Sequence, residues 1–166
     1  IDRTDLVVLM GANPLESNGS LATAPDWPGR LAAVRDRGGR VVVIDPRRTK
    51  TARAADAHLA IRPGADALLL AAVVTELART GRVDPGHAGE WTVGLDEAIA
   101  SLAAFTPESV AVRSGVSPDE IRSLAAQLAY YFFCALFPTL LFLVAVASYF
   151  PVATLIDDLF KTLGGL

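Results

Sequence analysis

The sequence is poor in the residues that build disulfides and metal centres. Its 166 residues include one cysteine, Cys134, and two histidines, His58 and His87. A single cysteine excludes an internal disulfide and a multi-cysteine metal site built from this chain alone. Neither histidine has another histidine or a cysteine nearby at ligand spacing. We therefore interpret both as surface or packed side chains and expect no metal ligand.

Signals for catalysis and for nucleic-acid binding are also missing. Ser17, Ser20 and Ser114 lack the Gly-x-Ser-x-Gly setting and an evident base partner, so we name no catalytic residue. The net charge is −3, whereas nucleic-acid binding normally needs a clustered basic surface. We expect no nucleic-acid partner.

Charge is missing from the C-terminal part of the chain. Tyr130–Phe150 contains no charged side chain, although 20% of the whole sequence is charged. A helix needs about 20 apolar residues to cross a bilayer. We therefore predict a soluble, cytoplasmic domain over residues 1–129 and a hydrophobic membrane-type helical tail over residues 130–166. The tail would associate with the lipid bilayer through residues 130–156. Ile1 follows no initiator methionine or signal peptide, so we expect a piece of a longer protein.

Strands and helices alternate in the predicted soluble part. The apolar run Leu6–Met10 is typical of a strand buried on both faces of a parallel sheet, and Arg40–Ile44 repeats the pattern with Val41, Val42, Val43 and Ile44. Trp27–Arg37 lies between them, has helical composition and is followed by two glycines that end a helix. This order of strand, helix and strand predicts an α/β fold.

Further elements complete this α/β domain with a helical end. A short strand is predicted at His58–Ile61, followed by a helix from Asp66 to about Leu77 that Asp66 would cap. Two more helices are predicted at about Leu95–Phe105 and Ser117–Ala129. Ser117 and Glu120 have the spacing of a capping box, which marks the start of the last helix.

Two loops follow the carboxyl ends of the first two strands, where parallel sheets bind their ligands. In Gly11–Ser17, glycine lets the backbone approach a ligand, and Asn13 and Glu16 offer directional hydrogen bonds. Asp45 is placed to accept from a ribose hydroxyl or a base edge, and the basic residues after it could hold a pyrophosphate. Ordinary strand-ending or solvated turns are the alternatives.

A nicotinamide dinucleotide site is disfavoured by the spacing. The first loop is not a Gly-x-Gly-x-x-Gly motif, and Pro14 removes an amide that a phosphate could use. The separation of Gly11 and Asp45 also exceeds the roughly 20 residues that are usual in that fingerprint.

Four segments together resemble the molybdopterin oxidoreductases, the family of formate dehydrogenases, periplasmic nitrate reductases and dimethyl sulfoxide reductase. The segments are Asp5–Ser17, Val41–Ala54, Leu59–Leu70 and Phe105–Ala129. Several runs keep the order and spacing of that family. They are Val-Val-Val-Ile-Asp-Pro-Arg-Arg-Thr-Lys-Thr-Ala, then Ile-Arg-Pro-Gly-Ala-Asp, and then Thr-Pro-Glu-Ser-Val followed by Gly-Val-Ser-Pro-Asp-Glu-Ile-Arg. The family usually has threonine where Ala65 stands.

The resemblance implies a Rossmann-like parallel-sheet domain, present here as a fragment, that holds one of two molybdopterin guanine dinucleotides. The first loop would line the dinucleotide, the second would hold its guanosine end, and a third would contact the same cofactor. The implied cofactor-binding residues are Gly11, Ala12, Asn13, Pro14, Leu15, Glu16, Ser17, Asp45, Pro46, Arg47, Arg48, Thr49, Gly64, Ala65 and Asp66. The family's iron–sulfur cysteines and molybdenum ligand lie upstream in the full enzymes. The remaining domains of the parent oxidoreductase would therefore hold the molybdenum and the cluster, and would be partners of this domain.

The apolar tail resembles a different family. Tyr130–Leu143 is similar to an early membrane helix of the YihY/BrkB inner-membrane proteins. Molybdopterin oxidoreductases continue into more soluble sequence at this point, which indicates a junction of two unrelated reading frames near Leu128–Tyr130. The leading hypothesis is a truncated molybdenum oxidoreductase domain with a foreign tail. The alternatives are a YihY/BrkB-type membrane protein with an appended soluble segment and a natural membrane-anchored redox subunit.

Overall fold

The computed structural model describes residues 1–19 and 24–131. Ile1–Ala129 forms one compact unit, which ends at the residue before the predicted tail. The predicted hydrophobic tail lies outside the described residues, apart from Tyr130 and Tyr131. Within the described residues, no helix combines the length and the apolar character that a membrane span requires.

Among the described residues, three parallel strands form the sheet in the order β1, β2, β3. β1 (Leu6–Met10) and β2 (Arg40–Ile44) have the predicted bounds, whereas β3 (Ala57–Leu59) is shorter than predicted and begins one residue earlier. The register places Met10 opposite Ile44, and Ile44 opposite Leu59. The carboxyl ends of the three strands therefore lie at one edge of the sheet, and the α/β prediction is confirmed.

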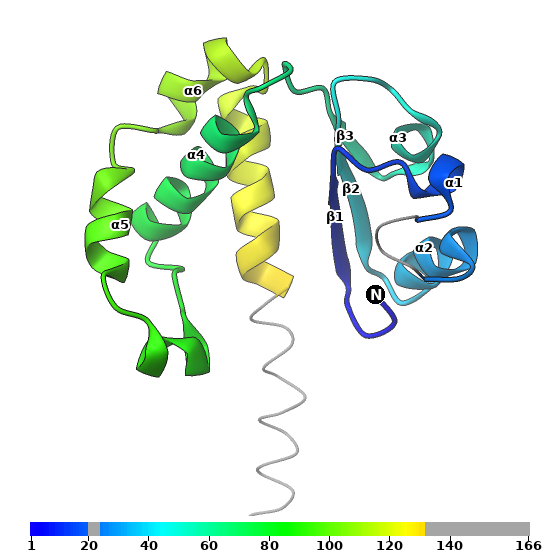
Figure 1. Cartoon of the computed structure of the whole chain (residues 1–166), viewed down its shortest axis with the longest axis horizontal. Coiled ribbons are helices and arrows are strands. Elements are labelled where there is room, and N and C mark those ends of the chain that lie inside the picture. The colour runs from blue at the N-terminus through cyan, green and yellow to red at the C-terminus, as the bar shows by residue number, and fades with distance from the viewer. Residues whose placement is uncertain (20–23, 132–166) are drawn as a thin grey trace, which may run out of the picture. The chain divides into compact units, whose positions relative to one another are not determined.

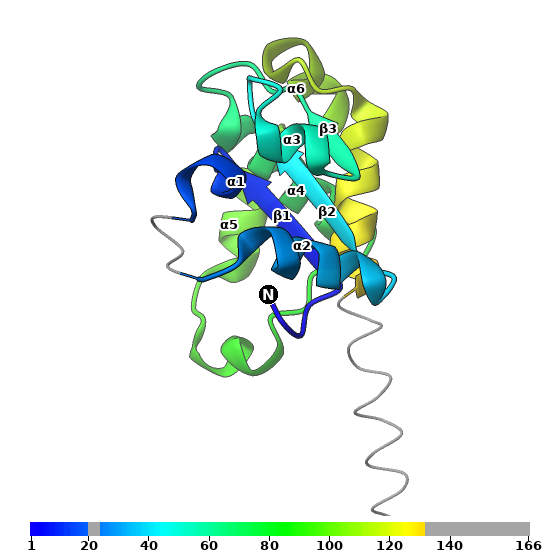
Figure 2. The same cartoon turned by 90° about the vertical axis from the view of Figure 1, so that its right-hand side faces the viewer.

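Helices cover both faces of this sheet (Figures 1 and 2). On one face α2 (Trp27–Asp36) packs Trp27, Leu31 and Val34 against the strand residues Val7 and Val41. This follows from the alternation of side chains along a strand, since β2 points Val41 to one face and Val42 to the other. Two short helices, α1 (Pro14–Ser17) and α3 (Lys50–Ala54), lie on the same side as α2.

The opposite face carries the larger core. It is covered by α4 (Asp66–Arg79), α6 (Pro107–Ser114) and a helix that the structure describes over residues 118–131. Apolar side chains from these helices and from the strands form one buried cluster, which includes Val42, Ile44, Leu69, Val73, Val110, Ile121 and Leu124. α5 (Leu95–Ser101) contacts α4, and the 3-10 helix η1 (Gly86–Trp91) lies in a stretch, residues 79–94, that is exposed throughout.

Three helix predictions need correction. α4 begins at Asp66 as expected, but its N-cap is Ala65 without a side-chain hydrogen bond, and the helix continues to Arg79. The helix predicted for Leu95–Phe105 ends at Ser101. α6 was not predicted; Pro107 starts it and the Thr106 hydroxyl caps it by accepting from the amide of Ser109 at 3.2 Å.

The predicted capping box before residue 118 is present. The amide of Ser117 donates to Oε2 of Glu120 at 2.9 Å, and the amide of Glu120 donates to the Ser117 hydroxyl at 3.3 Å. This reciprocal pair satisfies two amides that would otherwise lack partners at the start of the helix.

Candidate functional site

The three predicted loops leave the sheet from its carboxyl edge. The amide of Gly11, just after β1, donates to the carbonyl of Ile44 at 2.9 Å, and the amide of Asp45 donates to the carbonyl of Leu59 at 3.2 Å. These bonds extend the strand pairing and start the first two loops side by side. The third loop connects β3 to the start of α4, which lies toward the same end of the strands (Figure 1).

In the first loop, the side chain of Asn13 joins β1 to α3. Its Oδ1 accepts from the amide of Thr51 at 3.2 Å and from the Thr51 hydroxyl at 2.7 Å. Because a backbone amide can only donate, the oxygen of Asn13 must face Thr51, and the Asn13 NH₂ group faces elsewhere. That NH₂ group has no hydrogen-bond partner within residues 1–19 and 24–131. Asn13 is therefore able to donate to a ligand, whereas its acceptor is already engaged.

The other residues of the first loop divide between packing and exposure. Pro14 is buried, and Leu15 packs against the α2 cluster. Glu16 is exposed, and the Ser17 hydroxyl donates to the carbonyl of Asn13 at 3.2 Å.

The second loop centres on a buried carboxylate with one free oxygen. Asp45 is 8% exposed, and its Oδ1 accepts from the amide of Arg47 at 2.7 Å. Oδ2 of Asp45 accepts from no group in the part of the chain that the structure describes. Thr49 ends the loop as the N-cap of α3, where its hydroxyl accepts from the amide of Ala52 at 3.1 Å. This arrangement leaves Asp45 able to accept a hydrogen bond from a ligand.

Unpaired positive charge follows Asp45 in the sequence. Arg47, Arg48 and Lys50 are exposed and pair with no carboxylate among the described residues. The guanidinium of Arg53 donates to the carbonyl of Arg48 at 3.0 Å, which ties this side chain to the loop. Unpaired guanidinium groups bind phosphate oxygens in a bidentate manner.

The glycines of the first and third loops border open space. Gly11 and Gly64 have φ values of +61° and +79°, and a Cβ atom at either position would meet nothing within 4 Å. The positive φ explains why glycine stands there. Beside Gly64, Ala65 is buried and Asp66 is exposed at the start of α4.

The third loop is held in place by α6. The amide of Arg62 donates to the carbonyl of Ser114 at 2.7 Å, and its guanidinium donates to the carbonyl of Val112 at 2.6 Å. Arg62 thus bonds two carbonyls at the end of α6, and these bonds hold the backbone that leads to Gly64.

Two residues of this region, Thr51 and His58, were not among the predicted cofactor-binding residues. Thr51 is 1% exposed, and its hydroxyl accepts from the amide of Leu15 at 3.1 Å while it donates to Asn13. Nε2 of His58 lies 2.9 Å from the carbonyl oxygen of Asp45. Both contacts join residues that are distant in sequence, and no local pattern reveals them. Within residues 1–19 and 24–131, no group of three acidic, histidine or cysteine side chains could hold a metal ion.

Comparison with known proteins identifies the family. The family model described as "Molybdopterin oxidoreductase" matches residues 1–116. Formate dehydrogenase H of Escherichia coli K12 is 34% identical over 129 residues, which cover 78% of this chain and 17% of that protein. A nitrate reductase of Shewanella frigidimarina is 33% identical over 123 residues, which cover 73% of this chain and 13% of that protein.

A solved structure agrees with these sequence matches. Acetylene hydratase from Pelobacter acetylenicus superposes with a TM-score of 0.61 at 27% identity, over 74% of this chain and 16% of that one. The chain thus spans less than a fifth of the length of these relatives. The resemblance of residues 130–166 to the YihY/BrkB family receives no support from these comparisons, whereas the resemblance of residues 1–129 to the molybdopterin oxidoreductases is confirmed. The chain belongs to the molybdopterin oxidoreductase family.

Proposed function

We propose that this domain binds the guanosine and pyrophosphate portion of a molybdopterin guanine dinucleotide, within a longer molybdenum-dependent oxidoreductase. The family implies a molybdenum–pterin cofactor, and the three loops at the carboxyl edge of the sheet lie where parallel α/β folds bind nucleotides. The remaining domains of the parent enzyme would be the partners of this domain. They would also supply the molybdenum ligand and any iron–sulfur cluster.

The observation that carries this proposal is the carboxylate of Asp45, which has one oxygen bonded within the turn and one oxygen free. Oδ1 stabilises the turn through Arg47, and Oδ2 is left to accept from a ligand. A guanine base presents N–H donors on one edge, and its ribose presents hydroxyl donors. The carboxylate matches either donor, and the unpaired cations at Arg47 and Arg48 match the pyrophosphate.

The open space at Gly11 and Gly64 also fits a ligand with an extended phosphate backbone. Without a Cβ atom, the main chain can approach the ligand closely. Bound molybdenum supplies the redox chemistry in this class of enzyme. The residues of this chain would bind and orient the distal, nucleotide end of the cofactor, and Asn13 would donate a hydrogen bond to it.

Guanosine diphosphate (GDP) is the direct probe of this proposal. We expect the chain to bind GDP in isothermal titration calorimetry and to bind adenosine diphosphate more weakly. Asp45→Asn keeps the oxygen that accepts from Arg47 but replaces Oδ2 with an amide donor. It should weaken GDP binding by about 1–3 kcal/mol, because a ligand donor loses its acceptor. Asp96→Asn, an exposed carboxylate on α5, is the matched control. Equal GDP affinity in the wild type and Asp45→Asn would rule out the assigned role of Asp45.

A further inference from the structure

His58 on β3 holds the backbone at the start of the second loop. Its Nε2 lies 2.9 Å from the carbonyl oxygen of Asp45. Because a carbonyl oxygen can only accept, Nε2 must carry the hydrogen in this contact. The amide of Asp45 donates to the carbonyl of Leu59, the residue after His58. Both backbone polar groups of Asp45 are therefore bonded to β3.

The carbonyl that His58 holds belongs to the peptide bond between Asp45 and Pro46. Proline has no N–H group, so the following residue cannot anchor this peptide through an amide. The rest of the turn is closed by the amide of Arg47 on Oδ1 of Asp45 and by the amide of Thr49 on the carbonyl of Arg47 at 2.9 Å. Rotation of the Asp45–Pro46 peptide would move the amide of Arg47 away from Oδ1 of Asp45 and displace the side chain of Arg47. The bond from His58 opposes that rotation.

We propose that His58 is a positioning residue, which fixes the turn Asp45–Thr49 in the conformation that binds the guanosine and pyrophosphate groups. This inference rests on the proposed function of the site. His58 acts through the backbone of Asp45, and its role requires a hydrogen-bond donor at the position of Nε2. The ring of His58 is half-buried beside Asp45.

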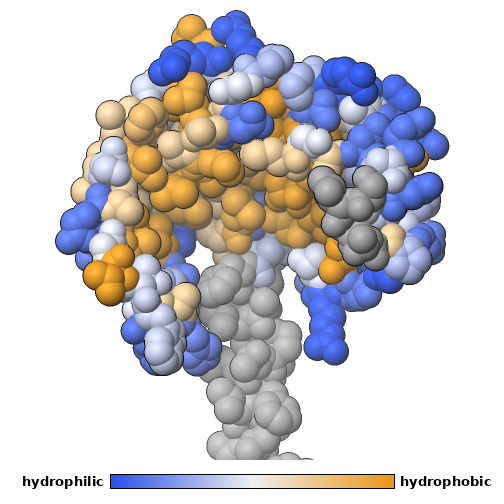
Figure 3. Space-filling view, viewed as in Figure 1, coloured by the Kyte–Doolittle hydropathy of each residue, from blue (hydrophilic) through white to orange (hydrophobic). Residues whose placement is uncertain are grey.

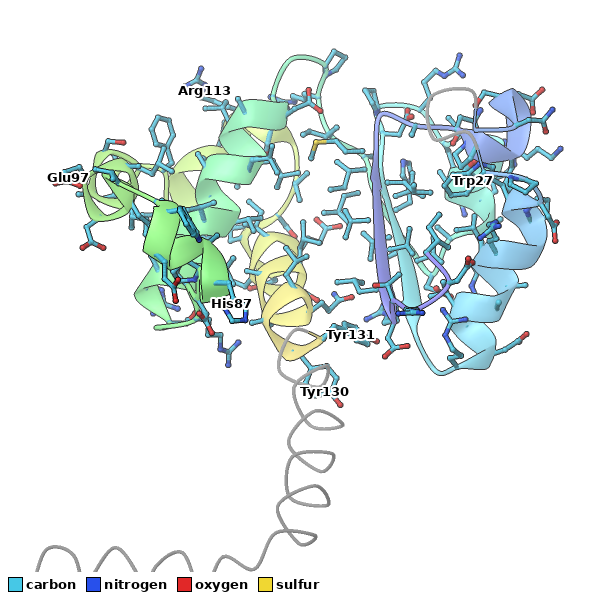
Figure 4. The ribbon with its side chains drawn as sticks, turned by 60° about the horizontal axis from the view of Figure 1, so that its bottom comes forward. Trp27, His87, Glu97, Arg113, Tyr130 and Tyr131 are labelled. Atoms are coloured by element: carbon cyan, nitrogen blue, oxygen red, sulfur yellow. The ribbon has the colours of Figure 1, made fainter. Side chains whose placement is uncertain are left out.

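Three variants of the full chain test this role. His58→Leu removes the donor and introduces an apolar side chain of comparable size. His58→Gln places an amide donor near the position of Nε2. His87→Leu is the matched control, because His87 is exposed in η1 and lies away from the sheet (Figure 4). Calorimetry measures the dissociation constant for GDP, and the carbonyl ¹³C signal of Asp45 reports its hydrogen bond.

We expect His58→Leu to weaken GDP binding about tenfold, which is about 1.4 kcal/mol, and to shift the Asp45 carbonyl signal. His58→Gln should bind GDP within about twofold of the wild type, and His87→Leu should match the wild type. The inference would be overturned if His58→Leu kept the wild-type affinity, or if His58→Gln were as weak as His58→Leu. A wild-type chain that bound no GDP would overturn the proposed function and this role in binding together. The first two outcomes, obtained with a wild type that binds GDP, reject the role of His58 alone.

Discussion

The buried hydroxyl of Thr51 joins the first loop to α3 by two hydrogen bonds, and its removal should be measurable. Thr51→Val keeps the shape of the side chain but leaves the amide of Leu15 and Oδ1 of Asn13 each short of one partner. We expect the free energy of unfolding to fall by about 1–3 kcal/mol, because buried polar groups lose their partners. Urea denaturation measures this change. Thr51→Ser keeps the hydroxyl, so its free energy of unfolding should fall much less. An equal fall in both variants would contradict this explanation.

Glu76 on α4 should make stability depend on pH. Its side chain is 8% exposed and bonds the guanidinium of Arg79 at 2.7 and 2.9 Å. This hydrogen bond holds the pKa of Glu76 below its usual range, and it outweighs burial, which raises that pKa. A lowered pKa in the folded state stabilises the fold above the unfolded-state value of about 4.3, and this stabilisation is lost as pH falls through the folded value.

Glu76→Gln should therefore lower the free energy of unfolding by about 1 kcal/mol at pH 7, a modest value because Arg79 is largely exposed. The difference from the wild type should shrink below about pH 4. Unfolding curves recorded between pH 3 and pH 7 measure it. Glu97→Gln on α5 changes an exposed carboxylate and should show no such trend (Figure 4). A difference between wild type and Glu76→Gln that stayed constant with pH would contradict the assignment.

The position of a site residue was predictable from the sequence where it follows directly from the position of a strand. Asp45 follows a buried strand directly, so its position at the carboxyl edge could be predicted from the sequence. The direction in which Asn13 points could not, because Thr51, 38 residues away, determines it. His58 was interpreted as a surface or packed residue, and the structure adds its bond to Asp45. Long-range hydrogen bonds leave no local pattern in a sequence.

At the level of elements, the end of α6 depends on Gly115 for two reasons. Its φ is +76°, and a Cβ atom there would lie 3.1 Å from Cγ of Arg62. Gly38, after α2, has a φ of +80° but no atom within 4 Å of its Cβ position. It is therefore a matched control for the cost of placing a Cβ atom on a residue with positive φ. We expect Gly38→Ala to cost about 1 kcal/mol and Gly115→Ala to cost more, because Arg62 must also move. Thermal unfolding of both variants measures the difference, and equal costs would show that Arg62 gives way freely.

The strand β1 lies at the edge of the sheet although all five of its residues are apolar. Figure 3 shows apolar residues gathered across the face between β1 and α4. Edge strands usually carry charged residues or proline that discourage further pairing, and β1 has neither. Within residues 1–19 and 24–131, β1 pairs with β2 alone, whereas β2 is paired on both sides. Amide hydrogen exchange should therefore be faster in β1 than in β2, and equal protection would indicate that another strand covers the edge.

The accuracy of the element predictions follows from the strength of each pattern. β1 and β2 were located to the residue because their apolar runs are continuous and bounded by glycine or aspartate. α6 was missed because it has eight residues and only Val110 among its large apolar side chains is buried. A short helix of this kind is stabilised by tertiary contacts with α4, which sequence periodicity does not report.

For the whole molecule, the comparisons show a chain that matches a small part of much longer relatives. The chain covers 16% of acetylene hydratase and 17% of formate dehydrogenase H. The family and the parallel sheet were predictable from the sequence, whereas the binding role of the three loops stays a prediction.

The uncharged sequence from Tyr130 to Phe150 leads to a prediction about the full chain. An apolar run of this length is sufficient to cross a bilayer. In a Triton X-114 phase separation, we expect the full chain to enter the detergent phase and a chain ending at Ala129 to stay in the aqueous phase. A full-length variant with Leu136→Lys and Leu140→Lys is the control. It should return toward the aqueous phase, because each lysine at the centre of a membrane helix costs about 2.5–3.5 kcal/mol. A wild-type chain that remained monomeric in the aqueous phase would contradict membrane association through residues 130–156.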